Sequence, residues 1–169
     1  MIVLVGFMGA GKTTVGRLLA AKLGIPFIDS DHVIAARAGK PIPAIFADDG
    51  EPAFRRLEHE VIAELVYGED IVLALGGGAA THEGTRALLA AAAVPVVYLR
   101  VSYEVAMNRV GGDRGRPMLT RPDVAQLHRD RDPLYAQAAT QTIDAGCRSP
   151  EELTLDILAR LGAHWPGGQ

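Results

Sequence analysis

The sequence predicts a three-layer α/β/α domain built on a parallel sheet, because short apolar runs alternate with amphipathic helical patterns. The first four runs contain almost no alternating polar residues, which is typical of parallel strands covered on both faces. Ligands in such sheets bind at the carboxyl ends of the strands, so functional residues are expected just after each strand. The predicted strands are residues 2–5, 26–28, 71–75, 94–99 and 142–143.

Helical periodicity is clearest in residues 51–66, where one stripe carries Phe54, Leu57, Val61 and Leu65. The last predicted helix begins with a capping box, with Ser149 as the N-cap, Pro150 at the first position and Glu152 at the third. The other predicted helices are residues 14–23, 85–92 and 102–109.

Bulk composition restricts the class of protein. The 169 residues suffice for one domain with an ample core, and a net charge of −3 argues against a broad nucleic-acid surface. The longest apolar stretch, residues 87–97, is broken by Pro95 and is too short to span a membrane. Cys147 is the sole cysteine, which excludes an internal disulfide and suits a reducing compartment. We therefore expect a cytoplasmic protein that binds neither nucleic acid nor membrane. We also expect it to be a monomer.

A glycine-rich motif, G-F-M-G-A-G-K-T, spans residues 6–13 between the first predicted strand and the first helix. A glycine-rich turn without a ligand is the alternative, but the strand and helix on either side are the context of a P-loop. Its backbone N–H groups would converge on phosphates at the positive end of a helix. Lys12 can reach the β- and γ-phosphates, and the Thr13 hydroxyl can bind Mg²⁺. The motif predicts a nucleoside triphosphate site.

Two carboxylates, Asp29 and Asp31, follow the second strand. Beside Mg·ATP, one can complete the metal shell through water while the other orients or deprotonates an attacking hydroxyl. The alternative is that Asp31 only caps the next helix.

Two further sets of residues each have a structural and a functional interpretation. Arg55 and Glu58 are three residues apart, which suits either a solvated ion pair or a guanidinium aimed into a cleft, whereas Arg56 is expected to face solvent. The turn Gly76-Gly77-Gly78 after the third strand would let a ligand approach the backbone closely; a plain connector is the alternative.

Two charged segments remain ambiguous from their composition alone. Residues 111–117 are rich in glycine and arginine, which suits an exposed loop or a lid that brings an arginine to a transferred phosphoryl group. Residues 129–135 alternate charges before Pro133, as in a solvated charge run.

In this order, the motifs resemble those of shikimate kinases, the P-loop kinases of aromatic amino-acid biosynthesis. The resemblance covers residues 1 to about 161, and F-R-R-x-E followed by G-G-G and R-x-P-L-Y is its most specific part. The matching stretches are G-F-M-G-A-G-K-T-T-V-G, D-S-D, D-G-E-P-A-F-R-R-L-E, G-G-G-A, R-G-R-P-M-L and R-D-P-L-Y. The resemblance implies an adenylate-kinase-like P-loop kinase fold with a five-stranded parallel sheet, a substrate-binding region at about 29–60 and a lid at about 110–121.

The resemblance also implies roles for individual residues, with ATP, Mg²⁺ and shikimate as ligands. The catalytic residues would be Lys12, Asp31 and the lid arginine Arg116. Mg²⁺ would be held by Thr13 and Asp29. The ATP site would comprise Gly9, Ala10, Gly11, Lys12, Thr13, Thr14, Arg109, Arg116, Arg148 and Pro150. The shikimate site would comprise Asp31, Arg55, Glu58, Gly76, Gly77, Gly78 and Arg131.

The chain departs from the family by being shorter by about one helical turn between Pro117 and Arg131. Arg131 stands two residues before Pro-Leu-Tyr, so it is assigned the carboxylate-binding role in preference to Arg129. Three of the five histidines, His32, His59 and His128, match no role in the family and are expected to be surface or packing residues.

The predicted reaction is transfer of the ATP γ-phosphoryl group to the 3-hydroxyl of shikimate. Two alternatives remain open: a kinase of similar fold that acts on gluconate or another small metabolite, and a nucleotide-dependent switch that closes on ATP without phosphorylating an acceptor.

Overall fold

Apolar residues of β1 (Ile2–Val5) place this strand at the centre of the sheet, where all four of its side chains are buried. Pairing is parallel throughout, and the strand order is β2-β3-β1-β4-β5. The other strands are β2 (Phe27–Asp29), β3 (Val72–Ala74), β4 (Val96–Arg100) and β5 (Gln141–Asp144). The computed structural model describes residues 1–111 and 123–162, and within them the predicted five-stranded parallel sheet is confirmed.

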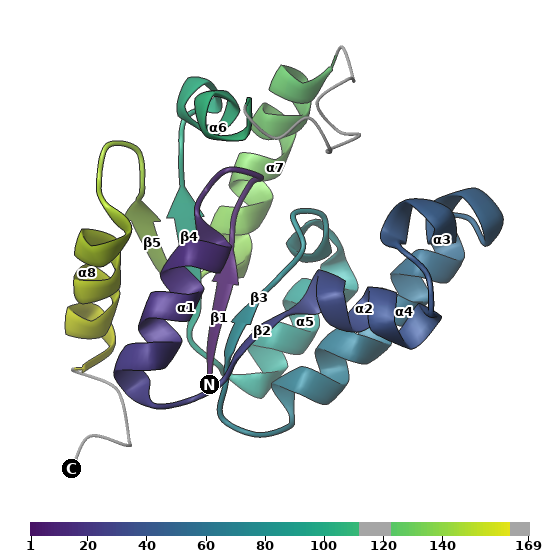
Figure 1. Ribbon diagram of the computed structural model, residues 1–169, viewed down its shortest axis with the longest axis horizontal. Helices are drawn as coiled ribbons and strands as arrows, with labels where there is room; N and C mark the ends of the chain where they lie inside the picture. Colours follow the sequence, from purple (N-terminus) through teal and green to yellow (C-terminus); the bar gives the residue numbers. More distant parts are fainter. Residues whose placement is uncertain (112–122, 163–169) are drawn as a thin grey trace.

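Helices cover both faces of this sheet. In Figure 1, α1 and α8 lie side by side in front of the sheet, while α5 and α7 lie behind it. The helices are α1 (Lys12–Leu23), α2 (Ser30–Ala38), α3 (Ile42–Asp48), α4 (Glu51–Val66), α5 (Glu83–Ala92), α6 (Tyr103–Val110), α7 (Val124–Ala138) and α8 (Pro150–Gly162), with a 3₁₀ turn η1 (Ala79–Thr81). The three-layer architecture predicted from the sequence is confirmed.

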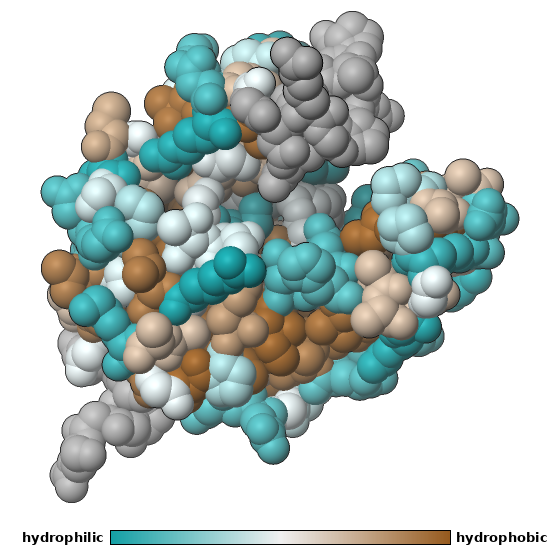
Figure 2. All heavy atoms as spheres, in the orientation of Figure 1, coloured by the Kyte–Doolittle hydropathy of each residue, from teal (hydrophilic) through white to brown (hydrophobic). Residues whose placement is uncertain are grey.

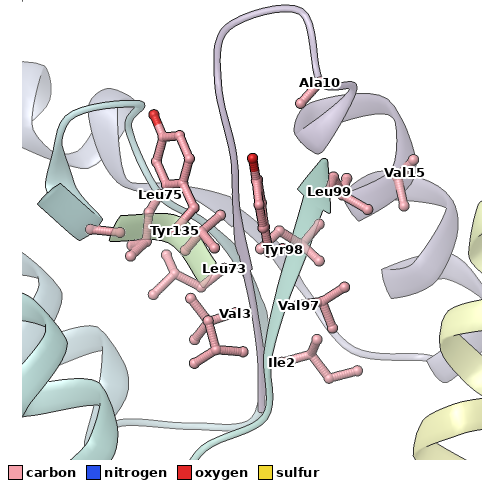
Figure 3. Close-up of a cluster of buried hydrophobic side chains, with 14 of the residues drawn as sticks. Ile2, Val3, Ala10, Val15, Leu73, Leu75, Val97, Tyr98, Leu99 and Tyr135 are labelled. Carbon is pink, nitrogen blue, oxygen red and sulfur yellow. The ribbon is translucent and has the colours of Figure 1, made fainter. Parts of the chain in front are cut away.

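Two hydrophobic clusters support two parts of the molecule. The larger cluster fills the space between the sheet and its covering helices, and Figure 3 shows part of it around β1 and β4. The smaller cluster joins α2, α3 and α4 through Ile34, Ile45, Phe54 and Val61. Figure 2 shows α3 at the tip of a projection, with a hollow between it and the body of the molecule. The smaller cluster therefore packs the three helices of the projection against one another.

The predicted capping box at the start of α8 is confirmed. The backbone N–H of Glu152 donates to Ser149 Oγ at 3.1 Å, and the backbone N–H of Ser149 donates to the Glu152 carboxylate at 2.7 Å. These bonds satisfy two N–H groups that the helix itself leaves without a partner.

Helices α3 and α7 were not predicted. Helix α3 has only seven residues, too few for a clear period. Helix α7 contains Pro133 and the charge run, and both features argue against a helix when they are judged locally. It is stabilised by tertiary contacts, including the burial of Tyr135 against the sheet. The interpretation of residues 129–135 as a solvated charge run was therefore wrong for part of the segment.

None of the helices within the described residues combines the length and the apolar character needed to cross a membrane.

Candidate active site

A cavity of about 420 Å³ opens at the start of α1, where the P-loop follows β1. Its walls come from the P-loop, from α6 and from the start of α8, three parts of the chain that meet at the carboxyl ends of the strands. The lining includes Gly9, Ala10, Gly11, Lys12, Thr13, Thr14, Arg109, Arg148 and Pro150. The structure thus brings together, around one cavity, all of the described residues that the sequence assigned to ATP.

The P-loop backbone has a positive φ, which favours glycine, at Gly6, Gly9 and Gly11. Gly9 has φ +75°, and a Cβ there would lie 2.6 Å from the carbonyl oxygen of Ala106 in α6. Gly11, the N-cap of α1, has φ +94°. Lys12 follows it at the first helical position, and its Nζ donates to the carbonyls of Gly6 at 2.7 Å and Phe7 at 3.1 Å. The P-loop therefore packs on α6, and Lys12 lines the cavity.

Two arginines border the cavity and are anchored differently. Arg109 Nη2 donates to the carbonyls of Ala145 and Gly146 after β5, at 2.8 and 2.9 Å, and Nη1 donates to the carbonyl of Gly9 at 3.3 Å. It therefore links the P-loop to the loop before α8. Arg148 forms an ion pair with Asp156 at 2.7 Å, which fixes it against α8 at the edge of the cavity.

The two carboxylates at the end of β2 and the start of α2, Asp29 and Asp31, have different surroundings. Asp29 is the N-cap of α2, and its Oδ1 accepts from the backbone N–H of Asp31 at 3.0 Å. The alternative in which Asp31 caps α2 is therefore wrong, and Asp29 is the cap. Between them, the fully buried Ser30 accepts from the backbone N–H of Gly76 at 3.0 Å. This bond joins the end of β2 to the glycine turn after β3.

The Asp31 carboxylate lies against Gly76, where a Cβ would overlap Asp31 Oδ1. Burial raises the pKa of Asp31, and the charge of Asp29 raises it further, while Lys12 and Arg55 act in the opposite direction. The opposing effects of Lys12 and Arg55 place this carboxylate within electrostatic reach of both the P-loop and α4. A carboxyl with a raised pKa in such a position is suited to accept a proton.

Arg55 is held on α4 by carboxylates and aromatic rings together. Its Nη1 lies 2.7 Å from Glu58 Oε2, and Glu51 lies 3.3 Å from its Nη2. The guanidinium lies 5.0 Å from the ring centre of Phe54 and 6.0 Å from that of Phe46. Glu58 is only 3% exposed, and its burial raises its pKa while Arg55 opposes that shift. The solvated ion pair considered from the sequence is therefore wrong, because one member is buried.

Arg56, by contrast, is exposed, as predicted.

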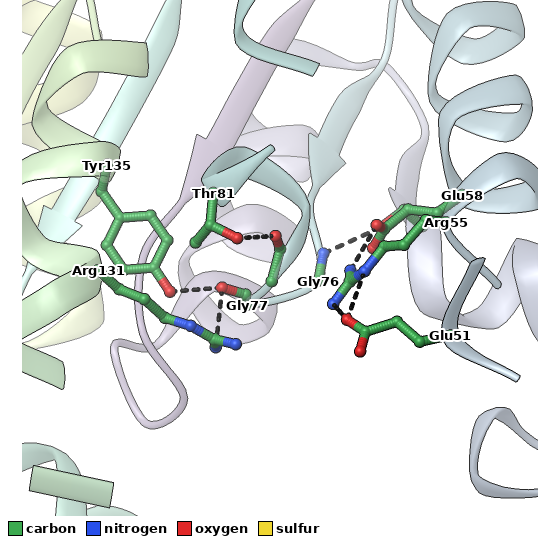
Figure 4. A network of polar contacts seen from close by, with 10 residues as sticks. Glu51, Arg55, Glu58, Gly76, Gly77, Thr81, Arg131 and Tyr135 are labelled. Carbon is green, nitrogen blue, oxygen red and sulfur yellow. Dashed lines mark hydrogen bonds and ion pairs between the residues drawn. The ribbon is translucent and has the colours of Figure 1, made fainter. Parts of the chain in front are cut away.

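Side chains of α7 and α4 approach the glycine turn after β3 from opposite sides. Figure 4 shows Arg131 and Tyr135 approaching Gly77 from α7, with Arg55 on the opposite side of the turn. The Gly77 carbonyl accepts from Arg131 Nη1 at 3.2 Å and from the Tyr135 hydroxyl. A Cβ on Gly78 would lie 3.1 Å from both terminal nitrogens of Arg55 and 3.6 Å from Arg131 Nη2. The two guanidinium groups thus converge on this turn.

Three side chains of this region received no role from the sequence: Tyr98, Asp132 and Tyr135. The Tyr98 hydroxyl donates to Asp132 Oδ1 at 2.6 Å, and the rings of Tyr98 and Tyr135 are 5.2 Å apart. Figure 3 shows both hydroxyls directed toward the end of the core where Ala10 of the P-loop lies. Tyr135 is part of the R-D-P-L-Y motif, which was the available signal. Tyr98 carried none, because it resembles any aromatic residue of a buried strand.

The histidines behave as expected where the structure shows contacts. His128 packs edge-on against Phe7 and its Nε2 lies 2.9 Å from the carbonyl oxygen of Val101, while His32 and His59 are exposed.

The predicted lid arginine, Arg116, and most of the predicted lid lie outside the described residues, so they remain predictions.

Comparison with known proteins agrees with this geometry. The family model described as shikimate kinase matches residues 8–162. The chain belongs to the shikimate kinase family. A shikimate kinase of Mycobacterium avium is 46% identical over 95% of this chain and 93% of its own length, and one of Pseudomonas syringae pv. tomato is 46% identical over 95% of both. The predicted family, and with it an ATP-dependent kinase of a small-molecule acceptor, is confirmed.

Solved shikimate kinases share the fold over nearly the whole chain. The enzyme of Acinetobacter baumannii, described as in complex with shikimate, has a TM-score of 0.88 and 42% identity, covering 98% of this chain and 94% of its own. The enzyme of Bacteroides thetaiotaomicron has a TM-score of 0.87 and 31% identity, with 95% and 97% covered. A gluconokinase of Sinorhizobium meliloti, with a TM-score of 0.60 and 22% identity over 96% and 91%, shows the likeness of fold alone.

Proposed function

We propose that this enzyme transfers the γ-phosphoryl group of ATP to the 3-hydroxyl of shikimate through a set of residues gathered around Asp31. The observation that carries the proposal is the position of the Asp31 carboxylate. It lies against Gly76, within electrostatic reach of Lys12 on the nucleotide side and Arg55 on the other side. A hydroxyl seated between these two regions would be next to both a proton acceptor and a phosphoryl donor.

On the nucleotide side, the P-loop and the start of α1 would bind the triphosphate. Backbone N–H groups of residues 9–14 and the helix dipole favour negative charge at this end of α1. Arg109 and Arg148, with Pro150, would flank the base, since all three line the same cavity as the P-loop. The preference for adenine rests on the family.

Mg²⁺ would be held by oxygen atoms of Thr13 and Asp29. The fit is chemical: a hydroxyl at the start of α1 and a carboxylate at the end of β2 are the hard donors that Mg²⁺ prefers, with phosphate oxygens and water completing the shell. When bound, the ion would neutralise charge on the phosphates during transfer.

On the acceptor side, Arg55 and Arg131 would bind the shikimate carboxylate, because paired guanidinium groups converge beside Gly78. Glu58 would hold Arg55 in place through the 2.7 Å ion pair. The glycine turn, residues 76–78, would line the ring, since the absence of side chains there leaves room beside Asp31 and the two arginines.

In the reaction, the acceptor hydroxyl oxygen would form the new bond to the γ-phosphorus while the bond to the β-γ bridging oxygen breaks and ADP leaves. Asp31 would orient this hydroxyl and receive its proton. Lys12 and Arg116 would offset negative charge that develops on the transferred group and on ADP. Because phosphoryl transfer has a loose transition state, positioning and charge account for most of the acceleration.

The predictions for domain organisation, oligomeric state, location, partners and pathway are also part of this proposal. The substrate-binding region would comprise residues 29–60 and the lid residues 110–121 of a single domain. The enzyme would act as a monomer in the cytoplasm, without nucleic-acid or membrane partners, in the synthesis of chorismate.

The deciding experiment measures ADP release from Mg·ATP with shikimate and gluconate as parallel acceptors, and identifies the phosphorylated carbon of the product. Release with shikimate alone, and phosphate on the 3-oxygen, supports the proposal. Release with gluconate alone would place the chain with other metabolite kinases. ATP binding without release to either acceptor would favour the nucleotide-dependent switch.

A further inference from the structure

The Tyr135 side chain bridges the hydrophobic core and the glycine turn. Its ring is 1% exposed and packs on Tyr98, while its hydroxyl reaches out of the core to donate to the Gly77 carbonyl. Burial raises the pKa of Tyr135 to about 12, so the hydroxyl keeps its proton at neutral pH and acts as a donor to this carbonyl. The bond therefore ties a rigid, buried ring to a turn that has no side chains of its own.

The Gly77 carbonyl oxygen also accepts a hydrogen bond from Arg131. Arg131 Nη1 donates to Gly77 at 3.2 Å, so that the two lone pairs of this oxygen are shared by one tyrosine and one arginine. Arg131 and Tyr135 are four residues apart on α7 and lie on the same side of the helix. Figure 4 shows the phenol and the guanidinium meeting at the one oxygen.

The rest of the turn is fixed by other contacts. Gly76 N–H donates to the buried Ser30 Oγ at 3.0 Å, and the Gly78 carbonyl accepts from Thr81 Oγ1 at 2.6 Å. Tyr135 completes this set at the middle residue of the turn. With the Gly77 carbonyl fixed, one terminal nitrogen of Arg131 has a defined resting partner, and Nη2 remains directed toward Gly78, where Arg55 also lies.

We propose that Tyr135 is a positioning residue for the acceptor site: its hydroxyl fixes the Gly77 carbonyl, which in turn orders the Arg131 guanidinium before the acceptor carboxylate arrives. An arginine side chain loses rotamer freedom when it is fixed, so an enzyme that orders it in advance binds its ligand more tightly. The inference rests on the proposed role of Arg131 in binding shikimate.

The first test is the Tyr135→Phe variant, which removes one oxygen atom and keeps the ring against Tyr98. The KM for shikimate should rise about 3- to 10-fold, the usual effect of one hydrogen bond, while the KM for ATP stays within about twofold. A uniform loss of activity without a selective rise in the KM for shikimate would overturn the proposal, because a purely structural role predicts that result.

The matched control is Tyr98→Phe, which also removes a buried tyrosine hydroxyl on the same pair of rings. This hydroxyl donates to Asp132 and not to the turn. The variant should lower the melting temperature at least as much as Tyr135→Phe and leave the KM for shikimate within about twofold of the wild type. An equal rise of this KM in both variants would contradict the proposal, since the position of α7 as a whole would then be responsible.

A double-mutant cycle with Arg131→Ala separates this inference from the proposed function. If Tyr135 acts through Arg131, adding Tyr135→Phe to Arg131→Ala should change kcat/KM for shikimate by less than about twofold. Effects that multiply in the double variant would overturn the inference and leave the role of Arg131 intact. An unchanged KM for shikimate in Arg131→Ala alone would instead overturn the proposed role of Arg131 in binding shikimate, and with it the premise of this inference.

Discussion

Oδ1 of Asp29 accepts a hydrogen bond from the backbone N–H of Asp31 at 3.0 Å, so the first acid of the D-S-D motif is the N-cap of α2. The carboxylate of the second acid, Asp31, lies against Gly76. The two carboxylates therefore differ in what surrounds them, although they are only two residues apart. The pKa of Asp31 is raised by its burial and, to a lesser degree, by the charge of Asp29. Different surroundings permit different roles for two chemically identical groups.

Replacing Asp29 by Asn should weaken the use of Mg²⁺ without weakening the fold. Asparagine is as good an N-cap as aspartate, so the bond to the Asp31 N–H is retained while the charge is lost. The Mg²⁺ concentration for half-maximal activity should rise by about tenfold or more. A Mg²⁺ titration at saturating shikimate, beside a melting curve, measures both effects. An unchanged Mg²⁺ requirement would contradict the role assigned to Asp29.

Replacing Asp31 by Asn should remove most turnover while ATP binding survives. The amide keeps the shape of the side chain but cannot accept the proton of the attacking hydroxyl. We expect kcat to fall by about 10² to 10⁴, the range for a lost general base. Steady-state kinetics and ATP titration of the variant measure the two quantities. Turnover near that of the wild type would show that Asp31 is neither the base nor an essential orienting group.

The same variant should be more stable than the wild type at neutral pH. Because the pKa of Asp31 is raised above its ordinary value of 3.8, the folded protein holds this proton more tightly than the unfolded chain does. Ionised Asp31 thus destabilises the ligand-free fold at pH 7, and the penalty disappears as pH falls through the raised pKa to below 3.8. Asparagine carries no such penalty.

Melting temperatures of the ligand-free wild type and the Asp31→Asn variant should therefore differ at pH 7, with the variant higher, and the difference should shrink at acidic pH. A variant that is less stable at pH 7 would indicate that attraction to Lys12 and Arg55 outweighs the cost of burial, contrary to the direction of the pKa shift.

The features that the sequence predicted well depend on residues that lie close together in the chain. The P-loop, the capping box of Ser149 and Glu152, and the bounds of α4 each depend on neighbouring residues or on one helical stripe. Shared position at the carboxyl ends of parallel strands then predicted which of these segments would meet.

The parts that sequence reasoning missed depend on contacts between distant segments. Tyr98 and Asp132 are 34 residues apart in the chain, and neither residue type alone indicates the pair. In the charge run, Asp132 turns toward the core while Arg129 is exposed and bonds to Gln126. Asp132 and Arg129 differ in their surroundings only because of the way α7 packs on the sheet. The sequence did not predict this helix, because Pro133 lies within it.

Replacing Arg131 by Ala should raise the KM for shikimate by about 10- to 100-fold, as expected for a lost charged hydrogen bond, with the KM for ATP nearly unchanged. Arg129→Ala is the matched control, because Arg129 is two residues away on the same helix but exposed. It should leave both constants within about twofold. A raised KM in the Arg129 variant and not in the Arg131 variant would transfer the carboxylate-binding role to Arg129.

Replacing Gly76 by Ala should impair catalysis far more than stability. The φ of Gly76 is outside the left-handed region, so alanine fits the backbone, but its Cβ would overlap the Asp31 carboxylate. The end of an aspartate side chain can rotate away at little cost to the fold. Asp31 would then be displaced from the acceptor hydroxyl, and a misplacement of about 1 Å can cost about 10²-fold in rate.

Gly84→Ala is the matched control for this variant, because a Cβ at the start of α5 would lie 3.8 Å from the His59 ring, an ordinary contact. It should retain full activity and, since alanine favours a helix, an equal or slightly higher melting temperature. For Gly76→Ala we expect a melting temperature close to that of the wild type and kcat/KM for shikimate reduced by about tenfold or more. Full activity in the Gly76 variant would mean that Asp31 does not need its position beside the glycine turn, and the arrangement proposed for phosphoryl transfer would be wrong.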